Sequence, residues 1–505
     1  MSPNFDRPTP TEKVVARRKR WAWIIGLILL ALVVYQFLFA NEYVIAQESE
    51  ADHFKYGSIG SETTGLPSQV LLALPAMYKE RLGGQGWRYF GLLYEQGEDL
   101  PIGFSRRVIT GVERAWFNCS LCHVGTYRLP GDDRQHKILG APSNNLKLYE
   151  LIRFLIDVGR DPSFTAQALT AAINSDQVPG HLNVVERLVY RYIAFPRIKA
   201  GLTRVGQQLA FLERQEPWGP GRVDTFNPYK AIQFGFPMGP ETLDEVALNG
   251  ASDYPSLWMQ APREGMNLHW DGNNSSVAER NLSAALGAGV TPATVDRAAI
   301  ARIEAWMRDL PPPRYPPAAP IDREAAARGA GLFAQYCGRC HGRGDFEGYH
   351  YGKEQYPALG HVVALSEIGT DRGRWASYTA DFAAAQNTLY AGYPWRFRHF
   401  RKTDGYANHP LDGIWARSPY LHNGSVPTLR DLLEPAERRP KVWYRGSDEL
   451  DLERVGYQSR TEAPNLFRYD TSVAGNGNAG HEGPEYGTEL SAAEKDALVE
   501  YMKTL

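Results

Sequence analysis

The sequence predicts a mostly α-helical protein in which one N-terminal transmembrane helix precedes two domains with long inserted loops. Three observations predict this arrangement: an uncharged run at 21–40, a Cys-x-x-Cys-His pattern that occurs twice, and a proline-rich segment between the two copies. The chain has 505 residues, which is enough for two to four domains with sizeable cores. Its formal net charge of -2 gives no indication of nucleic acid as a partner.

The N-terminal segment is predicted to cross a membrane. The run WAWIIGLILLALVVYQFLFA carries no charge over the about 20 residues that a spanning helix needs, so we assign 21–42 as the transmembrane helix. The preceding ARRKR favours a cytoplasmic tail at 1–20. The alternative is a cleaved signal peptide, for which Val44 and Ala46 supply a small-residue cleavage pattern. The expected location is the bacterial inner membrane, with a single pass and the body of the protein in the periplasm.

The stretches FNCSLCHVG and YCGRCHGRG contain the repeated motif and all four cysteines of the chain. Cys-x-x-Cys-His is the attachment sequence of c-type haem, because the two thiols reach the vinyl groups while the histidine lies over the iron. A zinc site or a redox dithiol is the alternative. We therefore predict two covalently bound haem c groups, held by Cys119, Cys122 and His123 and by Cys337, Cys340 and His341.

A domain boundary is predicted at 311–321, where six prolines prevent a helix. It separates an N-terminal haem c domain with large insertions at 43–310 from a C-terminal cytochrome c domain at 322–505. Helical patterns occur at 146–159, 181–195 and 293–310 in the first domain. In the second, a helix is expected to lead into YCGRCH, and LSAAEKDALVEYMKTL is expected to form a closing helix with a capping box at Ser491 and Glu494.

The occupant of the sixth iron position decides between electron transfer and chemistry. Methionine is not expected at the second haem, since Met502 on the terminal helix is the only methionine after the linker. His481 lies in the glycine-rich GNGNAGHEGPEYG and is the preferred sixth ligand, as part of a loop that could swing onto the iron. His422, in ARSPYLHNGSVPTL, is the second candidate metal ligand.

A reaction site is predicted in MNLHWDGNNSSVAERNLSAALGAG. It brings His269, Trp270, Asp271 and Arg280 together beside small residues, as a haem distal pocket requires. The same residues also fit a polar turn that caps a helix through Asp271 or Ser276. His269 could instead ligate the first iron and close the site, and His136 is a weaker candidate for that role.

These motifs resemble the bacterial di-haem cytochrome c peroxidase superfamily, and within it the rubber-oxygenase-like branch. The segments that carry the resemblance are NCSLCH, LHWDGNNSSVAERNLSAALGAG, YCGRCH, PLDGIWARSPYLHNGSVPTLRDLLEP and GNAGHEGPEYGTEL. The resemblance implies one haem that reacts and one that relays electrons. Peroxidases of this type use a glutamine and a glutamate after WDG. Here Arg280 stands at the glutamine position and the residues near Val290 are apolar. Rubber oxygenases cleave polyisoprene with oxygen in an apolar pocket, where this sequence has His269 and Ala285.

The sequence therefore predicts a membrane-anchored periplasmic di-haem c-type oxidoreductase. Its N-terminal haem is expected to activate peroxide or dioxygen beside the predicted catalytic residues. Its C-terminal haem is expected to exchange electrons with a soluble cytochrome c or a membrane donor. Two other functions stay open: an electron-transfer module with both irons six-coordinate, and a rubber-oxygenase-like dioxygenase that cleaves an alkene.

Overall fold

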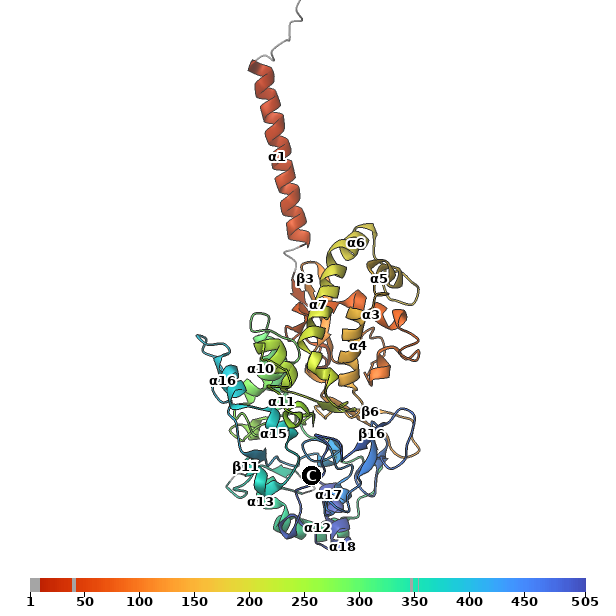
Figure 1. Cartoon of the computed structure of the whole chain (residues 1–505), viewed down its shortest axis with the longest axis vertical. Helices are drawn as coiled ribbons and strands as arrows, with labels where there is room; N and C mark the ends of the chain where they lie inside the picture. Colours follow the sequence, from red (N-terminus) through yellow and green to blue (C-terminus); the bar gives the residue numbers. More distant parts are fainter. Residues whose placement is uncertain (1–9, 39–41, 346–347, 353) are drawn as a thin grey trace, which may run out of the picture.

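The computed structural model describes residues 10–38, 42–345, 348–352 and 354–505. Helices account for 41% of the structure and strands for 12%, and long loops connect them (Figure 1). The prediction of a mostly α fold is therefore wrong. The sequence analysis missed the strands because each described strand is only two to six residues long, which is too short for an alternating pattern to be recognised.

Helix α1 (Pro10–Leu38) covers the predicted transmembrane segment and projects away from the body of the molecule (Figure 1). Among the described residues, no helix has a stretch that is both long and apolar enough to cross a membrane. α1 includes the basic cluster at 17–20 as well as the apolar run. By this finding the predictions of a transmembrane helix at 21–42 and of a single-pass inner-membrane location are wrong.

A four-stranded antiparallel sheet precedes the first Cys-x-x-Cys-His motif. Its strand order is β1 (Tyr43–Val44), β3 (Phe104–Ile109), β4 (Val112–Phe117) and β2 (Leu66–Pro67). Thr110 and Gly111 join β3 to β4, and both have positive φ, as a two-residue hairpin turn of the type I′ class requires. β4 ends at Phe117, so the sheet delivers the chain directly to the motif at 119–123.

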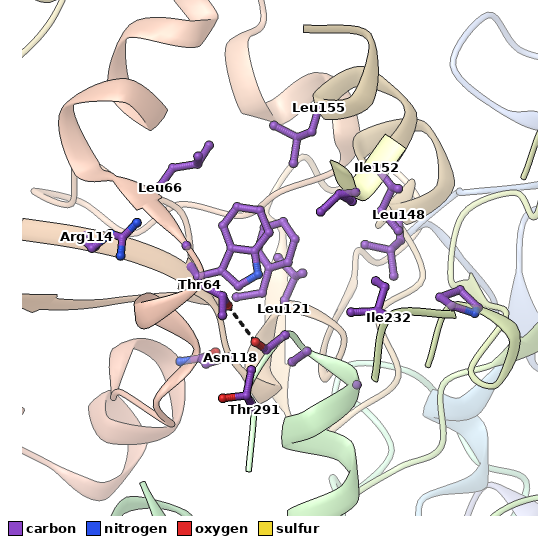
Figure 2. A pocket seen from close by; sticks show the side chains of 18 of the residues that line it. Thr64, Leu66, Arg114, Asn118, Leu121, Leu148, Ile152, Leu155, Ile232 and Thr291 are labelled. Carbon is purple, nitrogen blue, oxygen red and sulfur yellow. Dashed lines mark hydrogen bonds between the residues drawn. The ribbon is translucent and has the colours of Figure 1, made fainter. Parts of the chain in front are cut away.

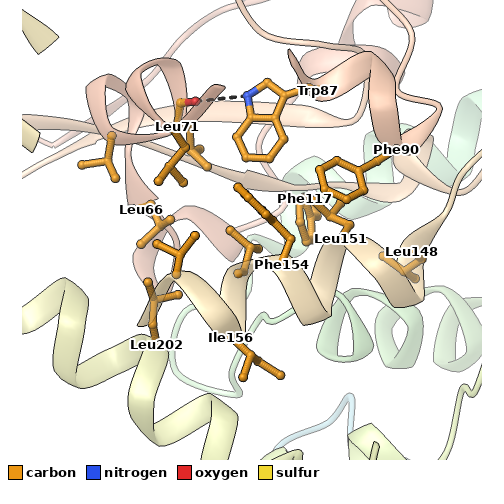
Figure 3. Packing of buried hydrophobic residues seen from close by; sticks show 14 of the residues in the cluster. Leu66, Leu71, Trp87, Phe90, Phe117, Leu148, Leu151, Phe154, Ile156 and Leu202 are labelled. Atoms are coloured by element: carbon orange, nitrogen blue, oxygen red, sulfur yellow. Dashed lines mark hydrogen bonds between the residues drawn. The ribbon is translucent and has the colours of Figure 1, made fainter. Parts of the chain in front are cut away.

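Three helices and the sheet enclose the main apolar core (Figure 3). The helices are α3 (Ser68–Met77), α4 (Leu148–Arg160) and α7 (Phe195–Gln208). Phe154 of α4 is 1% exposed and packs edge-on against Trp87, whose indole nitrogen donates to the Leu71 carbonyl at 3.0 Å. α4 confirms the helix predicted at 146–159. The pattern at 181–195 forms α6 (Val184–Val189) followed by a π-helical turn, Tyr190–Ala194.

The middle of the molecule contains α10 (Val277–Gly287), α11 (Arg297–Arg308), α15 (Gly373–Ser377) and α16 (Ala380–Thr388) (Figure 1). α11 confirms the helix expected before the prolines, although it begins four residues later than predicted. Residues 311–322 contain neither helix nor strand. The division into domains at this segment stays a prediction.

The C-terminal region is closed by α12 (Arg323–Tyr336) and α18 (Ala492–Met502). Gly329 of α12 lies so close to the Ala497 backbone that a Cβ atom would stand 2.0 Å from the carbonyl oxygen, which explains the glycine. The predicted capping box of Ser491 and Glu494 is present at the start of α18. Short antiparallel pairs complete the fold: β5 (Val124–Tyr127) with β6 (His136–Leu139), β7 (Arg222–Val223) with β8 (Ser252–Asp253), β9 (Arg343–Gly344) with β10 (Tyr349–His350), β11 (Val362–Ala364) with β12 (Gly405–Ala407), β13 (Val442–Arg445) with β16 (Phe467–Asp470), and β14 (Leu450–Asp451) with β15 (Gly456–Tyr457).

Candidate haem sites and reaction cavity

The two Cys-x-x-Cys-His motifs are held by different local structures. Asn118 caps a short turn at Cys119–Leu121, and its side-chain amide donates to the carbonyls of Lys55 at 3.2 Å and Gly57 at 3.1 Å. The second motif follows α12 directly and forms a further helical turn, Gly338–His341. Each motif is thus anchored to a buried element, which places its histidine in the interior.

Cys119, Cys122, Cys337 and Cys340 form no disulfide bond with one another. Burial raises the pKa of Cys119 to about 11 and the pKa values of Cys122 and Cys337 to about 12. A redox dithiol needs a lowered pKa, so these thiols do not resemble one. Within the described residues, no group of three or more His, Cys, Asp or Glu side chains is arranged to hold a metal ion.

The second motif brings its histidine close to a second histidine. The Nδ1 atom of His341 lies 2.8 Å from the His409 carbonyl, so Nδ1–H donates and Nε2 keeps a free lone pair. The ring of His481 faces His341 with 6.2 Å between the centroids. Two imidazoles that bind one metal from opposite sides, each at about 2 Å, place their centroids about 6 Å apart. The spacing of the two histidines therefore matches a six-coordinate iron.

His481 is pinned in place, in contrast to the swinging loop expected from its glycines. The Arg439 guanidinium donates to the carbonyls of Asn478, Gly480 and His481, and the His481 amide donates to the Ile368 carbonyl at 2.8 Å. Burial, together with the neighbouring His341, lowers the pKa of His481 to about 3. The imidazole is therefore neutral near pH 7, as a metal ligand must be. Its Nδ1 is buried without a hydrogen-bond partner among the described residues.

The other candidate histidines lie elsewhere. His422 is buried, and its ring stacks on the Tyr406 ring with 4.0 Å between the centroids. Among the described residues, the imidazole that lies near the His341 ring is that of His481. His136 stands on β6 and stacks on Tyr127 at 4.7 Å. Neither is placed as an iron ligand in this structure.

The first motif opens into a cavity of about 1260 Å³, whose wall includes Cys119, Cys122 and His123. Figure 2 shows aliphatic side chains from several elements around this space, among them Leu66, Leu121, Leu148, Ile152 and Ile232. Pockets for cofactors and small ligands usually measure about 300–1,000 Å³. The cavity can therefore hold a haem attached to the two thiols with space left for a reactant.

Three of the four predicted catalytic residues line this cavity, namely His269, Trp270 and Arg280. Asp271 does not line it. Its carboxylate accepts from the Arg374 guanidinium at 2.9 and 3.0 Å, and both side chains are at most 3% exposed. Asp271 is thus a structural counter-ion of Arg374, which itself reaches the cavity wall.

Asp271→Ala should lower the free energy of unfolding by about 3–5 kcal/mol, because it leaves Arg374 buried without its counter-ion. Urea unfolding followed by circular dichroism measures this change. Glu324→Ala, which removes the exposed i,i+4 partner of Arg328, is the control and should cost less than about 1 kcal/mol. Equal losses in the two variants would contradict the assigned role of Asp271.

Arg280 supplies a buried cation to the cavity. It is 8% exposed, and its Nη2 donates to Asn281 at 3.0 Å. Burial lowers the pKa of Arg280 to about 10, so the guanidinium stays charged near pH 7. Burial, and next the charge of Arg280, lower the pKa of His123 to about 4. The guanidinium is therefore within electrostatic reach of the proximal histidine.

Glu279, the neighbour of Arg280, does not offer a carboxylate to the cavity. Its oxygens accept from the amides of Arg398 at 2.9 Å and His399 at 3.0 Å, and from the His399 ring at 2.8 Å. The Glu279 carboxylate is therefore bound by residues 398–399 and is not part of the cavity wall.

His269 has a left-handed backbone with φ of 62°, and its Nδ1 lies 2.6 Å from the Asn273 side-chain oxygen. Burial, followed by the charge of Arg374, lowers its pKa to about 4. Among the described ring contacts, His123 meets Tyr254 at 6.1 Å and not His269. His269 is therefore neutral and lies in the cavity wall. Its ring does not contact the His123 ring in the way that the His481 ring contacts the His341 ring.

Trp270 and His409 connect the cavity to the second motif. Their rings meet edge to face at 5.6 Å, and the Trp270 indole nitrogen is fixed by the Asp253 carbonyl at 2.8 Å. His409 Nε2 lies 2.9 Å from the His269 carbonyl, and its own carbonyl accepts from His341. The cavity wall and the second Cys-x-x-Cys-His motif are thus linked through His409, which no sequence pattern singled out.

Sequence reasoning missed His409, Arg374 and Tyr254. His409 and Arg374 act on residues more than 100 positions away, and Tyr254 meets His123 across 131 positions, so no local pattern could have revealed them. The segment that carried the family resemblance begins at Pro410, so it did not include His409.

Comparison with known proteins supports a cytochrome. A family model described as "RoxA-like, cytochrome c-like" matches residues 405–444, the segment that contains His409 and His422. The uncharacterized protein y4iJ of Sinorhizobium fredii is 27% identical over 82% of this chain and 84% of its own length. The uncharacterized protein y4iM of the same organism is 31% identical over 50% of this chain and 64% of its own length. The chain therefore contains a RoxA-like cytochrome c-like segment, and haem is its expected cofactor.

Proposed function

We propose that this protein is a di-haem c-type oxidoreductase in which the two haem sites have different roles. Cys119, Cys122 and His123 would hold a haem that supplies the activation of peroxide or dioxygen, and Cys337, Cys340 and His341 would hold a haem that supplies electron transfer. The observation that carries the proposal is the difference between the two motifs. His341 faces a second histidine at 6.2 Å, whereas His123 faces a cavity of about 1260 Å³.

The roles of the cavity residues follow from their charges and contacts. Arg280 places a positive charge in a buried wall, where a preorganised donor stabilises negative charge that develops on oxygen. His269 is neutral and fixed by Asn273, so it can hydrogen-bond a reactant without a change of charge. Trp270, in the cavity wall, contacts His409, whose carbonyl accepts from His341, so these two residues would lie on a path for electrons between the two sites.

Electron paramagnetic resonance of the ferric protein tests the proposal. We expect one low-spin signal from the site of His341 and His481, and one high-spin signal from the open site, either at once or after one-electron reduction. Two low-spin signals that persist through half-reduction would mean that both irons are six-coordinate. The protein would then be an electron-transfer module, and the proposed reaction site would be wrong.

Trp270→Leu should slow electron transfer between the haems while each haem keeps its spectrum, because the contact with the His409 ring is lost. Stopped-flow absorbance after rapid reduction of the second haem measures the rate. Trp375→Leu is the control, since Trp375 bonds the Thr403 carbonyl and stands outside the Trp270–His409 contact. An unchanged rate in Trp270→Leu would remove this residue from the electron path.

A second candidate function is oxygenation of an apolar alkene. It is favoured by the aliphatic wall in Figure 2 and by the RoxA-like segment at 405–444. The two functions differ in what they consume. Formation of a cleaved alkene product with oxygen alone supports the oxygenase, whereas oxidation of a reduced cytochrome that requires peroxide supports the peroxidase. A soluble cytochrome c is the proposed electron-exchange partner in the second case.

A further inference from the structure

A basic and aromatic surface segment, YPWRFRHFRK at 393–402, lies a few residues after helix α16 (Figure 1). It contains four arginine and lysine residues and neither aspartate nor glutamate, although the whole chain has a net charge of -2. Arg396, Arg398 and Arg401 are exposed, and the phenylalanines that alternate with them are buried. The apolar core therefore holds this basic segment in place while its cations face solvent.

A buried carboxylate also fixes the backbone of the basic segment. Glu279 is 9% exposed and accepts from the amides of Arg398 at 2.9 Å and His399 at 3.0 Å. Binding to a partner costs free energy when a loop must be ordered at the interface. This cost is reduced here, because the backbone that carries the cations is already hydrogen-bonded to the core.

The positive charge of the basic segment is not neutralised by neighbouring acidic side chains. Arg401 donates to the neutral side chains of Asn267 and, at 3.4 Å, Ser275. In the ion pairs of the described residues, the basic segment takes part only through the His399 ring, which meets Glu279. Exposed like charges that lie close together repel one another and attract a surface of the opposite sign. The segment is therefore complementary to an acidic surface.

Aromatic side chains extend the same surface. Tyr393 is 54% exposed, and its ring stacks on the Trp395 ring with 4.6 Å between the centroids. The exposed Arg297 guanidinium lies 3.8 Å from the Trp395 centroid. Tyrosine, tryptophan and arginine are the residues that protein–protein interfaces favour and that contribute most of their binding energy. The composition of the surface thus fits a protein partner.

The basic segment packs against the residues that join the cavity to the second motif. The Arg401 amide donates to the Asn273 carbonyl at 2.9 Å, and the Ala407 amide donates to the Trp270 carbonyl at 2.8 Å. The chain then continues to His409, whose ring meets Trp270 at 5.6 Å and whose carbonyl accepts from the His341 ring. A partner on this surface would therefore lie beside the contact between Trp270 and His409.

We propose that residues 393–402, together with Arg297, dock the acidic face of a small soluble protein that carries one electron. The inference rests on the proposed function, which requires a redox partner. At each encounter the partner loses one electron and is oxidised, and the electron reduces the haem that His341 would hold by one. No bond is made or broken. The arginines steer the partner, and the aromatic side chains supply contact area.

Calorimetric titration of the full haem-loaded chain with two probe proteins tests the docking surface. The probes are a small acidic c-type cytochrome and a small basic one. We expect the acidic probe to bind and the basic probe not to bind. The affinity should fall as the ionic strength rises from about 0.01 M to about 1 M, because the distance over which charges act falls from about 30 Å to about 3 Å.

The double variant Arg396→Glu with Arg398→Glu should remove this binding. It should also slow reduction of the protein by the reduced acidic cytochrome by about 10–10³-fold at low salt, which is the usual range of electrostatic steering. Stopped-flow absorbance measures the rate. The double variant Arg17→Glu with Arg18→Glu on α1 is the matched control, since it changes two exposed arginines and the net charge by the same amount. It should leave the binding and the rate unchanged.

Equal losses in the two double variants, or preference for the basic cytochrome, would overturn the inference. Binding of phosphatidylglycerol vesicles or single-stranded DNA through the same arginines, without binding of the acidic cytochrome, would overturn it as well. Uncharged duroquinol separates docking from the proposed function. If duroquinol reduces the protein and the bound cytochrome does not, the inference is wrong. If neither reduces a protein that binds the acidic cytochrome through Arg396 and Arg398, the docking surface is supported and the proposed function fails.

Discussion

Replacement of His481 by alanine is expected to convert the second haem from low spin to high spin. The His481 ring lies 6.2 Å from the His341 ring between centroids. Under the proposed function, alanine would leave one side of the iron without a protein ligand. Electron paramagnetic resonance should lose the low-spin ferric signal of this haem. Absorbance should reveal binding of cyanide or carbon monoxide at a site that excluded both before the substitution. Added imidazole should restore the low-spin signal, because it can occupy the space that the side chain left.

His422→Ala is the matched control for this experiment. His422 is buried and was the second candidate ligand from the sequence, yet its ring stacks on Tyr406. It should leave both signals in place. A low-spin second haem in His481→Ala, or loss of that signal in His422→Ala, would show that the assignment of the sixth ligand is wrong.

Arg280→Met should slow the reaction of the first haem with peroxide or dioxygen by about 10²–10³-fold, which is the usual cost of removing one preorganised donor to developing negative charge. Methionine has a similar length and no charge, so the packing of α10 is largely retained. Stopped-flow absorbance measures the rate at several reactant concentrations. The loss should lie in the limiting rate more than in the concentration for half-saturation, since the charge on oxygen develops during the reaction.

Two variants separate the charge of Arg280 from a general effect on helix α10. Arg280→Lys keeps a cation and should recover part of the rate. Glu279→Gln alters the adjacent residue, whose carboxylate is turned toward residues 398–399, and should leave the rate within a few-fold of the unaltered protein. Equal rates for Arg280→Met and the unaltered protein would contradict the proposed role.

Local features of this protein could be derived from the sequence because the physics that produces them is local. Haem attachment needs two thiols and a histidine within five residues, so residues 119–123 and 337–341 can be recognised from the sequence as candidate attachment motifs. The capping box at Ser491 and the amphipathic pattern of α4 likewise depend on neighbours within one or two helical turns. The hydropathy of residues 21–42 was also a local signal, but the transmembrane helix predicted from it was wrong, because no described helix is long and apolar enough to cross a membrane.

Only the tertiary structure decided how the surroundings of the two Cys-x-x-Cys-His motifs differ. The sequence offered both His481 and His422 as ligands. The position of His481 depends on Arg439, which holds the 478–481 loop, and on Ile368, which lies 113 positions before His481 in the chain. The sequence also placed Asp271 with Arg280, whereas Arg374 turns the carboxylate away from the cavity. Contacts of this kind join distant parts of the chain, and their free energy is gained only when the whole core packs. For this reason the motifs could be predicted from the sequence, whereas the cavity and the contacts of His409 could not.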